Sequence, residues 1–232
     1  MPITTCVFDA YGTLFDVTAA ARRAAEEPQH AMLAAHWPKL ATDWRAKQLQ
    51  YSWLRAVSGE YCDFWRVTED ALDWALEASG LLEDGALRAR LLQLYWELDA
   101  YPEARALLQA LKAAGLKTAI LSNGSPRMLQ AAVDSADIAS LLDAQLSVES
   151  VGNFKPDRAV YQLVLDHFDV AADSVLFVSS NGWDVAGASG FGFQTVWVNR
   201  SGEPMDRLPH TPQFELANLS PIAKMITPNA QL

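Results

Sequence analysis

The sequence is poor in cysteine, in positive charge and in long apolar runs. Its two cysteines, Cys6 and Cys62, are far apart and lack metal-site spacing, so they imply no disulfide framework, and a reducing cytoplasm is expected. Lys and Arg number 18 against 28 Asp and Glu, a formal net charge of −10, which argues against nucleic acid or an anionic membrane as a partner. No apolar run approaches the roughly 18 residues that span a bilayer, and no signal-peptide pattern opens the sequence.

What the chain does contain is a series of short, apolar, β-branched runs. Each is too short for a helix, and most are nearly continuous in apolar character, as strands buried on both faces are. Helix-like segments at 103–114, 125–135 and 156–168 separate the later runs. Alternating strands and helices predict an α/β fold, a Rossmann-like doubly wound parallel sheet. The expected strands are 5–8, 117–121, 144–147, 175–178 and 195–198.

A long segment between the first two expected strands breaks this alternation. It contains no convincing strand and shows helical spacing, as in Trp37, Leu40 and Trp44. Thr68, followed by two acidic residues, is predicted to cap one of its helices. We therefore expect residues 16–98 to form an inserted helical cap subdomain of the four-helix type, and residues 1–15 and 99–232 to form the α/β core. An insertion at a carboxyl strand end would cover the ligand-binding edge of the sheet.

Polar residues follow the successive strands where each one ends. Asp9 follows the first strand, Ser122 ends the second, Lys155 precedes a later helix, and Asp184 follows the fourth. A lone Asp at a strand end is most often a turn residue, but four such groups at one sheet edge favour a catalytic site. In this order they resemble the four motifs of the haloacid dehalogenase superfamily, and the resemblance covers the whole core.

Two positions depart from the phosphatases of that superfamily. Their second acidic residue, which protonates the leaving alkoxide, is replaced by Tyr11, and an acidic magnesium ligand is replaced by Ser180. A halide is the anion of a strong acid and leaves without a proton, so an acid at position 11 would have no leaving group to protonate. A 2-haloacid brings a single carboxylate, which hydroxyl, amide and N–H donors can hold without a metal.

The sequence thus resembles the 2-haloacid dehalogenases that act on the L (S) enantiomer. Segments 43–55 and 177–184 are similar to the cap helix that carries their active-site arginine and to their fourth motif. The resemblance implies hydrolysis of a 2-halocarboxylate to a D-2-hydroxy acid and halide, through an ester on Asp9, with no cofactor and no metal. Together with the Trp-rich cap helices, it also implies a homodimer.

The resemblance implies a role for each candidate residue. Asp9 is the expected nucleophile, oriented by Thr13 and kept ionised by Lys155, with Tyr161 in the same network. Arg45 would receive the halide, and Asp184 would activate water. The remaining residues hold the geometry (Ser179, Asn181), donate hydrogen bonds to the substrate (Ser122, Asn123) or line the pocket around C2 (Ala10, Tyr11, Leu49, Phe64, Trp183).

Three alternatives stay open on the sequence alone. One is another hydrolase acting at carbon on this scaffold, such as one that opens a strained ring carboxylate. The second is a magnesium-dependent phosphatase, disfavoured by Tyr11 and Ser180. The third is a non-catalytic binding protein, disfavoured because Asp9, Lys155 and Asp184 are all present.

Overall fold

The core of the molecule is a parallel sheet of six strands in the order β3-β2-β1-β4-β5-β6. The computed structural model describes residues 2–226. Strand β1 lies inside the sheet, pairs in parallel with both β2 and β4, and is buried along its whole length. Backbone groups on both of its edges are therefore hydrogen-bonded, which fixes the position where the strand ends. The strands are β1 (Thr5–Phe8), β2 (Lys117–Ser122), β3 (Ala144–Ser147), β4 (Val175–Ser179), β5 (Gln194–Val198) and β6 (Phe214–Leu216).

The predicted fold class is confirmed, and so are all five predicted strands, with ends that differ by at most one residue. The sixth strand was not predicted. Strand β6 has three residues, Phe214 and Glu215 among them are exposed, and it pairs only with β5 at the edge of the sheet. A run this short and this exposed carries no periodicity by which a strand is recognised.

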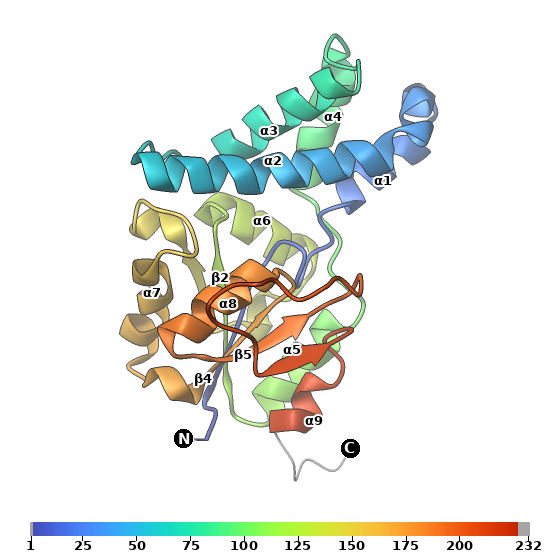
Figure 1. Ribbon diagram of the computed structural model, residues 1–232. Coiled ribbons are helices and arrows are strands. Elements are labelled where there is room, and N and C mark those ends of the chain that lie inside the picture. The colour runs from blue at the N-terminus through green and yellow to red at the C-terminus, as the bar shows by residue number, and fades with distance from the viewer. Residues whose placement is uncertain (1, 227–232) are drawn as a thin grey trace.

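Helices follow the strands and flank the sheet, as expected of a doubly wound fold (Figure 1). The segment predicted at 156–168 becomes helical only at Arg158, because the Asp157 side chain caps the helix by accepting the Ala159 N–H at 2.8 Å. These helices are α5 (Ala104–Ala113), α6 (Pro126–Ser135), α7 (Arg158–Phe168), α8 (Gly182–Phe191) and α9 (Ile222–Ile226), with short 3-10 turns between them.

Helices α1 to α4, here called the helical layer, lie together at one end of the molecule, and α2 runs across the top of the sheet unit (Figure 1). The chain leaves the sheet unit after Phe15 and returns at Ala100, and these two residues form an isolated antiparallel bridge. That bridge supports the division at residues 15 and 99, which remains a prediction. The layer contains α1 (Ala19–Glu26), a 3-10 segment (Pro28–Ala35), α2 (Trp37–Ser58), α3 (Phe64–Ala78) and α4 (Gly85–Tyr95).

The predicted cap at Thr68 is wrong. Helix α3 begins at Phe64, capped by Asp63, whose carboxylate accepts the Arg66 N–H at 2.9 Å. Thr68 lies inside the helix and is fully buried, and its hydroxyl donates to the Phe64 carbonyl at 2.8 Å. Packing against α2 stabilises the extra turn, which local sequence preference did not indicate.

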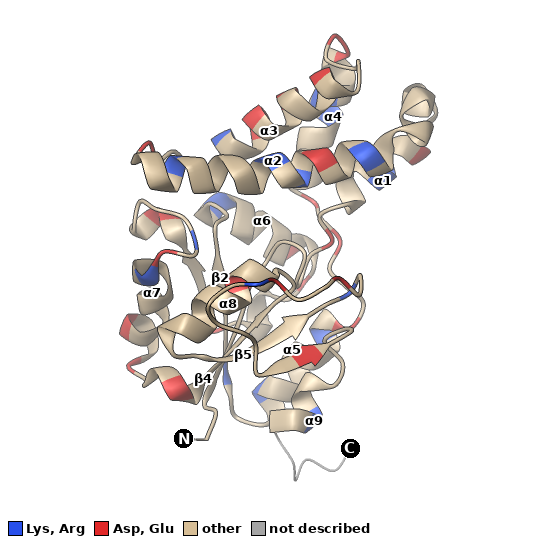
Figure 2. Cartoon of the chain, in the orientation of Figure 1, with Lys and Arg blue, Asp and Glu red and all other residues tan. Residues whose placement is uncertain are grey.

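Charged residues of both signs occur throughout the helical layer and the sheet unit (Figure 2). Within residues 2–226, no helix is both long enough and apolar enough to cross a membrane.

Candidate active site

Asp9 directly follows strand β1 and lies at the carboxyl edge of the sheet. The Asp9 N–H donates to the Val178 carbonyl at 2.9 Å, so the sheet pairing extends one residue beyond β1. The chain then turns at Gly12, which has a φ of 94°. A Cβ at Gly12 would lie 2.9 Å from Ser180 Oγ. Glycine is therefore required for its positive φ and for the close approach of the loops after β1 and β4.

The Asp9 carboxylate is held by three side chains from three different loops. Lys155 Nζ lies 3.2 Å from Oδ1, while Thr13 Oγ1 and Asn181 Nδ2 each donate to Oδ2 at 3.0 Å. Thr13 Oγ1 in turn accepts the Ser180 N–H at 2.8 Å and lies 3.2 Å from Ser180 Oγ. Asp9 is only 6% exposed. The carboxylate is thus fixed in orientation, and its charge is compensated by a buried ammonium.

Lys155 lies between two carboxylates. Its ammonium donates to Asp184 Oδ2 at 2.9 Å as well as to Asp9, and its side chain is 1% exposed. Asp184 is completely buried, and Tyr161 donates to its Oδ1 at 2.9 Å. Burial raises the pKa of Asp184, the Lys155 charge opposes this shift, and the Asp9 charge adds to it. A carboxylate with a raised pKa is a better proton acceptor than an ordinary one.

Arg45 reaches the same edge of the sheet from helix α2. Its Nη2 donates to the Tyr11 carbonyl and to Asn181 Oδ1, each at 3.2 Å. Both acceptors are neutral, and among residues 2–226 no carboxylate forms an ion pair with Arg45. The guanidinium charge therefore remains available to an anion.

A narrow, partly enclosed cavity, here called the closed cavity, lies between Asp9 and Arg45. Its volume is about 10 Å³, and seven other residues line it: Tyr11, Leu49, Phe64, Ser122, Asn123, Asn181 and Trp183. Two of these are oriented by backbone groups, because Ser122 Oγ accepts the Gly124 N–H at 3.1 Å and Asn123 Oδ1 accepts the Lys155 N–H at 3.0 Å. The cavity combines a fixed carboxylate, a cation and an apolar wall.

The remaining predicted residues lie behind this wall, not on it. Thr13, Lys155 and Asp184 belong to the network around Asp9, as does Ser179, whose Oγ accepts the Asn181 N–H at 3.1 Å. Ala10 is fully buried beneath the turn, and within the described part of the chain it is not one of the residues lining the cavity.

Sequence reasoning missed two features that shape the site. Ser180 was considered only as a lost metal ligand, yet its backbone and hydroxyl both contact Thr13. Tyr95 stacks on Tyr11 with ring centroids 5.7 Å apart and hydrogen-bonds Gln48 in α2. Ser180 lies within the recognised motif and could have been found there. Tyr95 lies in a helix that contains no motif, so nothing in the sequence marked it as part of the site.

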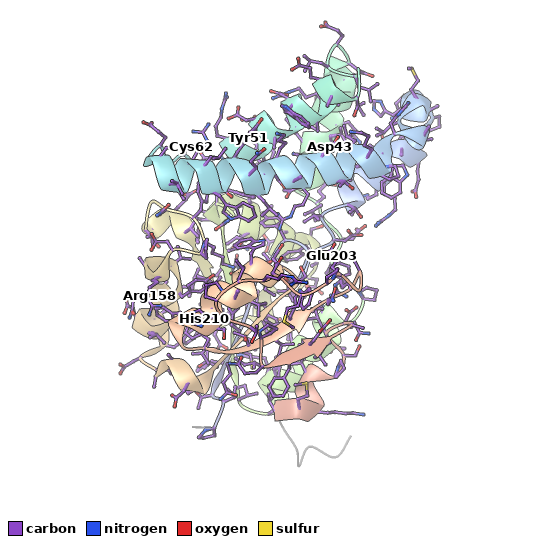
Figure 3. The ribbon with its side chains drawn as sticks, in the orientation of Figure 1. Asp43, Tyr51, Cys62, Arg158, Glu203 and His210 are labelled. Atoms are coloured by element: carbon purple, nitrogen blue, oxygen red, sulfur yellow. The ribbon has the colours of Figure 1, made fainter. Side chains whose placement is uncertain are left out.

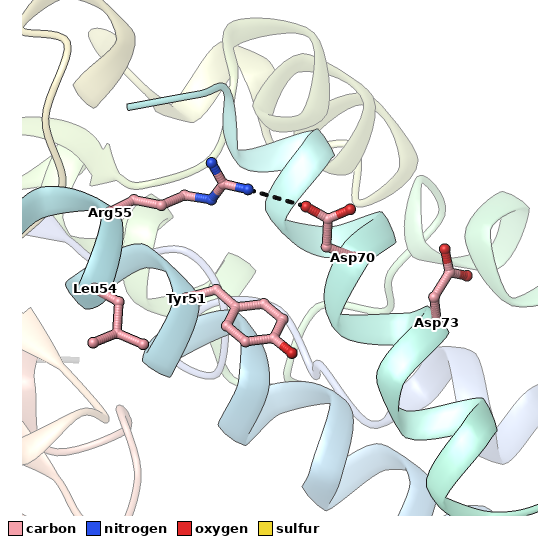
Figure 4. A pocket seen from close by; sticks show the side chains of 5 residues that line it. All are labelled: Tyr51, Leu54, Arg55, Asp70 and Asp73. Atoms are coloured by element: carbon pink, nitrogen blue, oxygen red, sulfur yellow. Dashed lines mark hydrogen bonds and ion pairs between the residues drawn. The ribbon is translucent and has the colours of Figure 1, made fainter. Parts of the chain in front are cut away.

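Another pocket lies outside the sheet edge, between α2 and α3 (Figure 4). It is lined by Tyr51, Leu54, Arg55, Asp70 and Asp73, and Arg55 forms an ion pair with Asp70 at 3.2 Å. No strand end contributes to it. Within residues 2–226, no group of three or more His, Cys, Asp or Glu side chains is arranged to hold a metal ion.

Comparisons with known proteins agree with this geometry. The family model of haloacid dehalogenase-like hydrolases matches residues 3–192, and the chain belongs to this family. It is 45% identical over 225 residues to (S)-2-haloacid dehalogenase 1 of Pseudomonas sp. (strain CBS-3), covering 97% of each chain. It is 37% identical to a haloacetate dehalogenase of Moraxella sp. (strain B), covering 97% of this chain and 98% of that protein.

A solved structure has the same fold over nearly the whole length of the chain. It is the L-2-haloacid dehalogenase of Xanthobacter autotrophicus with chloropropionic acid covalently bound. The two chains are 38% identical with a TM-score of 0.84, and the comparison covers 98% of this chain and 100% of that one.

Proposed function

We propose that this chain is an (S)-2-haloacid dehalogenase, which converts short L-2-haloacids to D-2-hydroxy acids and halide. The observation that best supports this proposal is the closed cavity. In it the Asp9 carboxylate, fixed by Lys155, Thr13 and Asn181, faces the Arg45 guanidinium, which has no acidic partner among residues 2–226. Its relatives of that name, and the relative that holds chloropropionic acid covalently, support the same reaction.

In the first step an Asp9 oxygen attacks C2 of the substrate and forms an ester. The carbon–halogen bond breaks, and the halide departs with the electron pair towards Arg45. The nucleophile needs no base, because a carboxylate is already ionised at neutral pH. Ser122 and Asn123 donate hydrogen bonds to the substrate, Ser122 to its carboxylate, and Tyr11, Leu49, Phe64 and Trp183 surround C2. Halide needs no proton, which explains why residue 11 need not be an acid.

In the second step water attacks the carbonyl carbon of the ester. Asp184 accepts one proton of that water and returns it to the departing hydroxy-acid oxygen. The other proton remains on the new Asp9 carboxyl and is released to solvent, which regenerates the Asp9 carboxylate. Tyr161 and Lys155 occupy one site on each Asp184 oxygen, and a carboxylate has about four acceptor sites in all. About two acceptor sites of Asp184 are therefore left unfilled by the side chains of residues 2–226.

A single turnover in oxygen-18 water tests the covalent route. With enzyme in excess over L-2-chloropropionate, the oxygen reaching the product comes from Asp9, so we expect unlabelled D-lactate and label in the peptide that contains Asp9. Mass spectrometry of the product and of the peptide measures the label in each. Labelled product with an unlabelled Asp9 peptide would show that Asp9 is not the nucleophile and acts instead as a general base. The configuration of the product cannot distinguish the covalent route from direct attack by water, since both invert C2.

Activity should be independent of added metal. Tyr11 and Ser180 stand where the related phosphatases place acids, and the Lys155 ammonium already compensates Asp9 and Asp184. We expect halide release from 2-chloropropionate to survive exhaustive treatment with a chelator. A loss of release that only magnesium restores would favour a phosphatase-like site instead.

Replacing Arg45 by Lys should lower kcat/KM for 2-chloropropionate by roughly 100-fold without unfolding the protein, as loss of a preorganised donor to a developing anion does. A planar guanidinium can contact the substrate carboxylate and the departing halide together, whereas an ammonium is a compact charge on a flexible stem. The matched control is Arg55→Lys on the same helix, where the side chain pairs with Asp70 (Figure 4). Near wild-type turnover of Arg45→Ala would exclude the role.

A further inference from the structure

The closed cavity is too small for the substrate of the proposed reaction. About 10 Å³ holds one water molecule at most, and a 2-haloacid is several times larger. Binding therefore requires side chains of the cavity wall to move. The direction of that movement determines which face of the molecule the substrate crosses.

A larger cleft, here called the outer cleft, adjoins the cavity where α2 meets the loops after β1, β4 and β5. Its volume is about 440 Å³, and the exposed residues Ser201 and Glu203 are among those that line it. Figure 3 shows Glu203 on the loop below α2. Five of the nine residues that line the closed cavity also line the outer cleft: Tyr11, Arg45, Leu49, Asn181 and Trp183. The two spaces are therefore separated by one layer of side chains.

Among the described residues, two members of this shared layer are held by no side-chain hydrogen bond: Leu49, and Trp183, whose ring packs edge-on against Trp53 with ring centroids 5.2 Å apart. Tyr11 is stacked on Tyr95, and Arg45 and Asn181 are held by hydrogen bonds. Leu49 and Trp183 are only partly buried, Leu49 has no polar group to hold it, and the buried Trp183 Nε1 has no hydrogen-bond partner. Rotating these two side chains breaks no hydrogen bond made by either of them.

A second cleft lies elsewhere between the helical layer and the sheet unit. Its volume is about 560 Å³, and it is lined by Asp63, Trp65, Trp96, Ser125, Pro126, Arg127 and Glu149. Although this cleft, here called the opposite cleft, is larger, it shares no lining residue with the closed cavity.

We propose that the outer cleft is the passage through which the 2-haloacid reaches Asp9, and that Leu49 and Trp183 form its gate. This inference rests on the proposed dehalogenase activity. Arg45 and Arg200 line the passage together with Glu203 and Asp206, and Arg200 is paired with Glu103 at 2.7 Å. Arg45 forms no ion pair among residues 2–226, so the anionic substrate meets an uncompensated cation at the inner end of the passage. Because Leu49 faces both spaces, its size limits the length of the acid that is accepted.

A bulky label in each cleft distinguishes the two routes. Cys62, which is partly exposed, is first replaced by Ser, while Cys6 stays unreactive because burial raises the pKa of its thiol to about 12. Ser201→Cys in the outer cleft and Arg127→Cys in the opposite cleft are then labelled with pyrene maleimide. We expect labelling at position 201 to remove most of kcat/KM for 2-chloropropionate, and labelling at 127 to leave it unchanged.

The gate is tested by a change in chain-length preference. Leu49→Ala should raise the ratio of kcat/KM for 2-bromohexanoate to that for 2-bromopropionate by about 10-fold or more. Leu54→Ala on the outward face of α2, where the residue is 58% exposed, should leave the ratio unchanged. Full activity after labelling at 201, loss on labelling at 127, or an unchanged ratio in Leu49→Ala would overturn the proposal. Inactivity of the unlabelled parent would instead count against dehalogenation itself.

Discussion

Replacing Asp184 by Asn should stop the reaction after the ester on Asp9 has formed. An amide cannot accept the proton of the attacking water, and a positioned general base contributes roughly 10²- to 10⁴-fold. The attack of Asp9 on C2 needs no base, so the first step should persist. The fold should persist as well, because Lys155 keeps Asp9 as its buried counter-ion at 3.2 Å.

The measurement is halide release on the millisecond to minute scale, with mass spectrometry of the quenched protein. We expect a burst of about one halide per active site, slow turnover afterwards, and a mass increase on the Asp9 peptide. Asp166→Asn, an exposed carboxylate on α7 that pairs only locally with Gln162, is the matched control and should turn over normally. Steady turnover of Asp184→Asn without a burst or an added mass would contradict the role of Asp184 as the base.

Replacing Lys155 by Met should destabilise the protein at neutral pH by about 3–5 kcal/mol, the typical cost of removing one partner from a buried ion pair. Two carboxylates, Asp9 and Asp184, would then lie buried without a cation. Ester formation should also be lost, because Asp9 loses the buried ammonium that orients it and compensates its charge at 3.2 Å.

The pH dependence of this loss has a defined sign. Burial already raises the pKa of Asp184, and without the Lys155 charge that opposes this shift the folded-state pKa rises further above the unfolded value near 3.9. The native state then binds more protons than the unfolded state, so the free energy of unfolding falls as pH rises above about 4. Lys155→Met should therefore be closest to the wild type at acidic pH and least stable, relative to it, at pH 8.

Urea denaturation at pH 5 and pH 8 measures this difference. The control is Lys117→Met, whose side chain is 60% exposed beside Asp143, and where an effect within about 1 kcal/mol is expected at both pH values. The double variant Lys155→Met/Asp184→Asn should recover part of the loss, because only one buried carboxylate remains. Equal stability of Lys155→Met and the wild type at pH 8 would show that the ammonium does not compensate the pair.

Two of the errors in the helices and strands have the same origin. Thr68 has the local features of a helix cap, but α3 extends a turn further back because its side chains pack against α2. Strand β6 exists because β5 offers it a paired edge, not because residues 214–216 carry a pattern of their own. In both places a tertiary contact outweighed a weak local preference.

The sequence by itself determined the sheet, the order of its strands along the chain, and the identity of the polar groups at their ends. Burial and periodicity are local properties, and the carboxyl ends of parallel strands must lie at one edge. The resemblance in segments 43–55 and 177–184 added the interpretation of Arg45 and Asp184.

Only the tertiary structure decided which of these groups touch each other and which of them face the cavity. Thr13 meets Ser180 across 167 positions of the chain and Arg45 meets Asn181 across 136, and no local pattern encodes such distances. The structure also places Asp184 behind Lys155, and it closes the cavity with side chains from α2, α3 and α8. These contacts depend on how separate elements pack at close density, which is a property of the whole fold and not of any one segment.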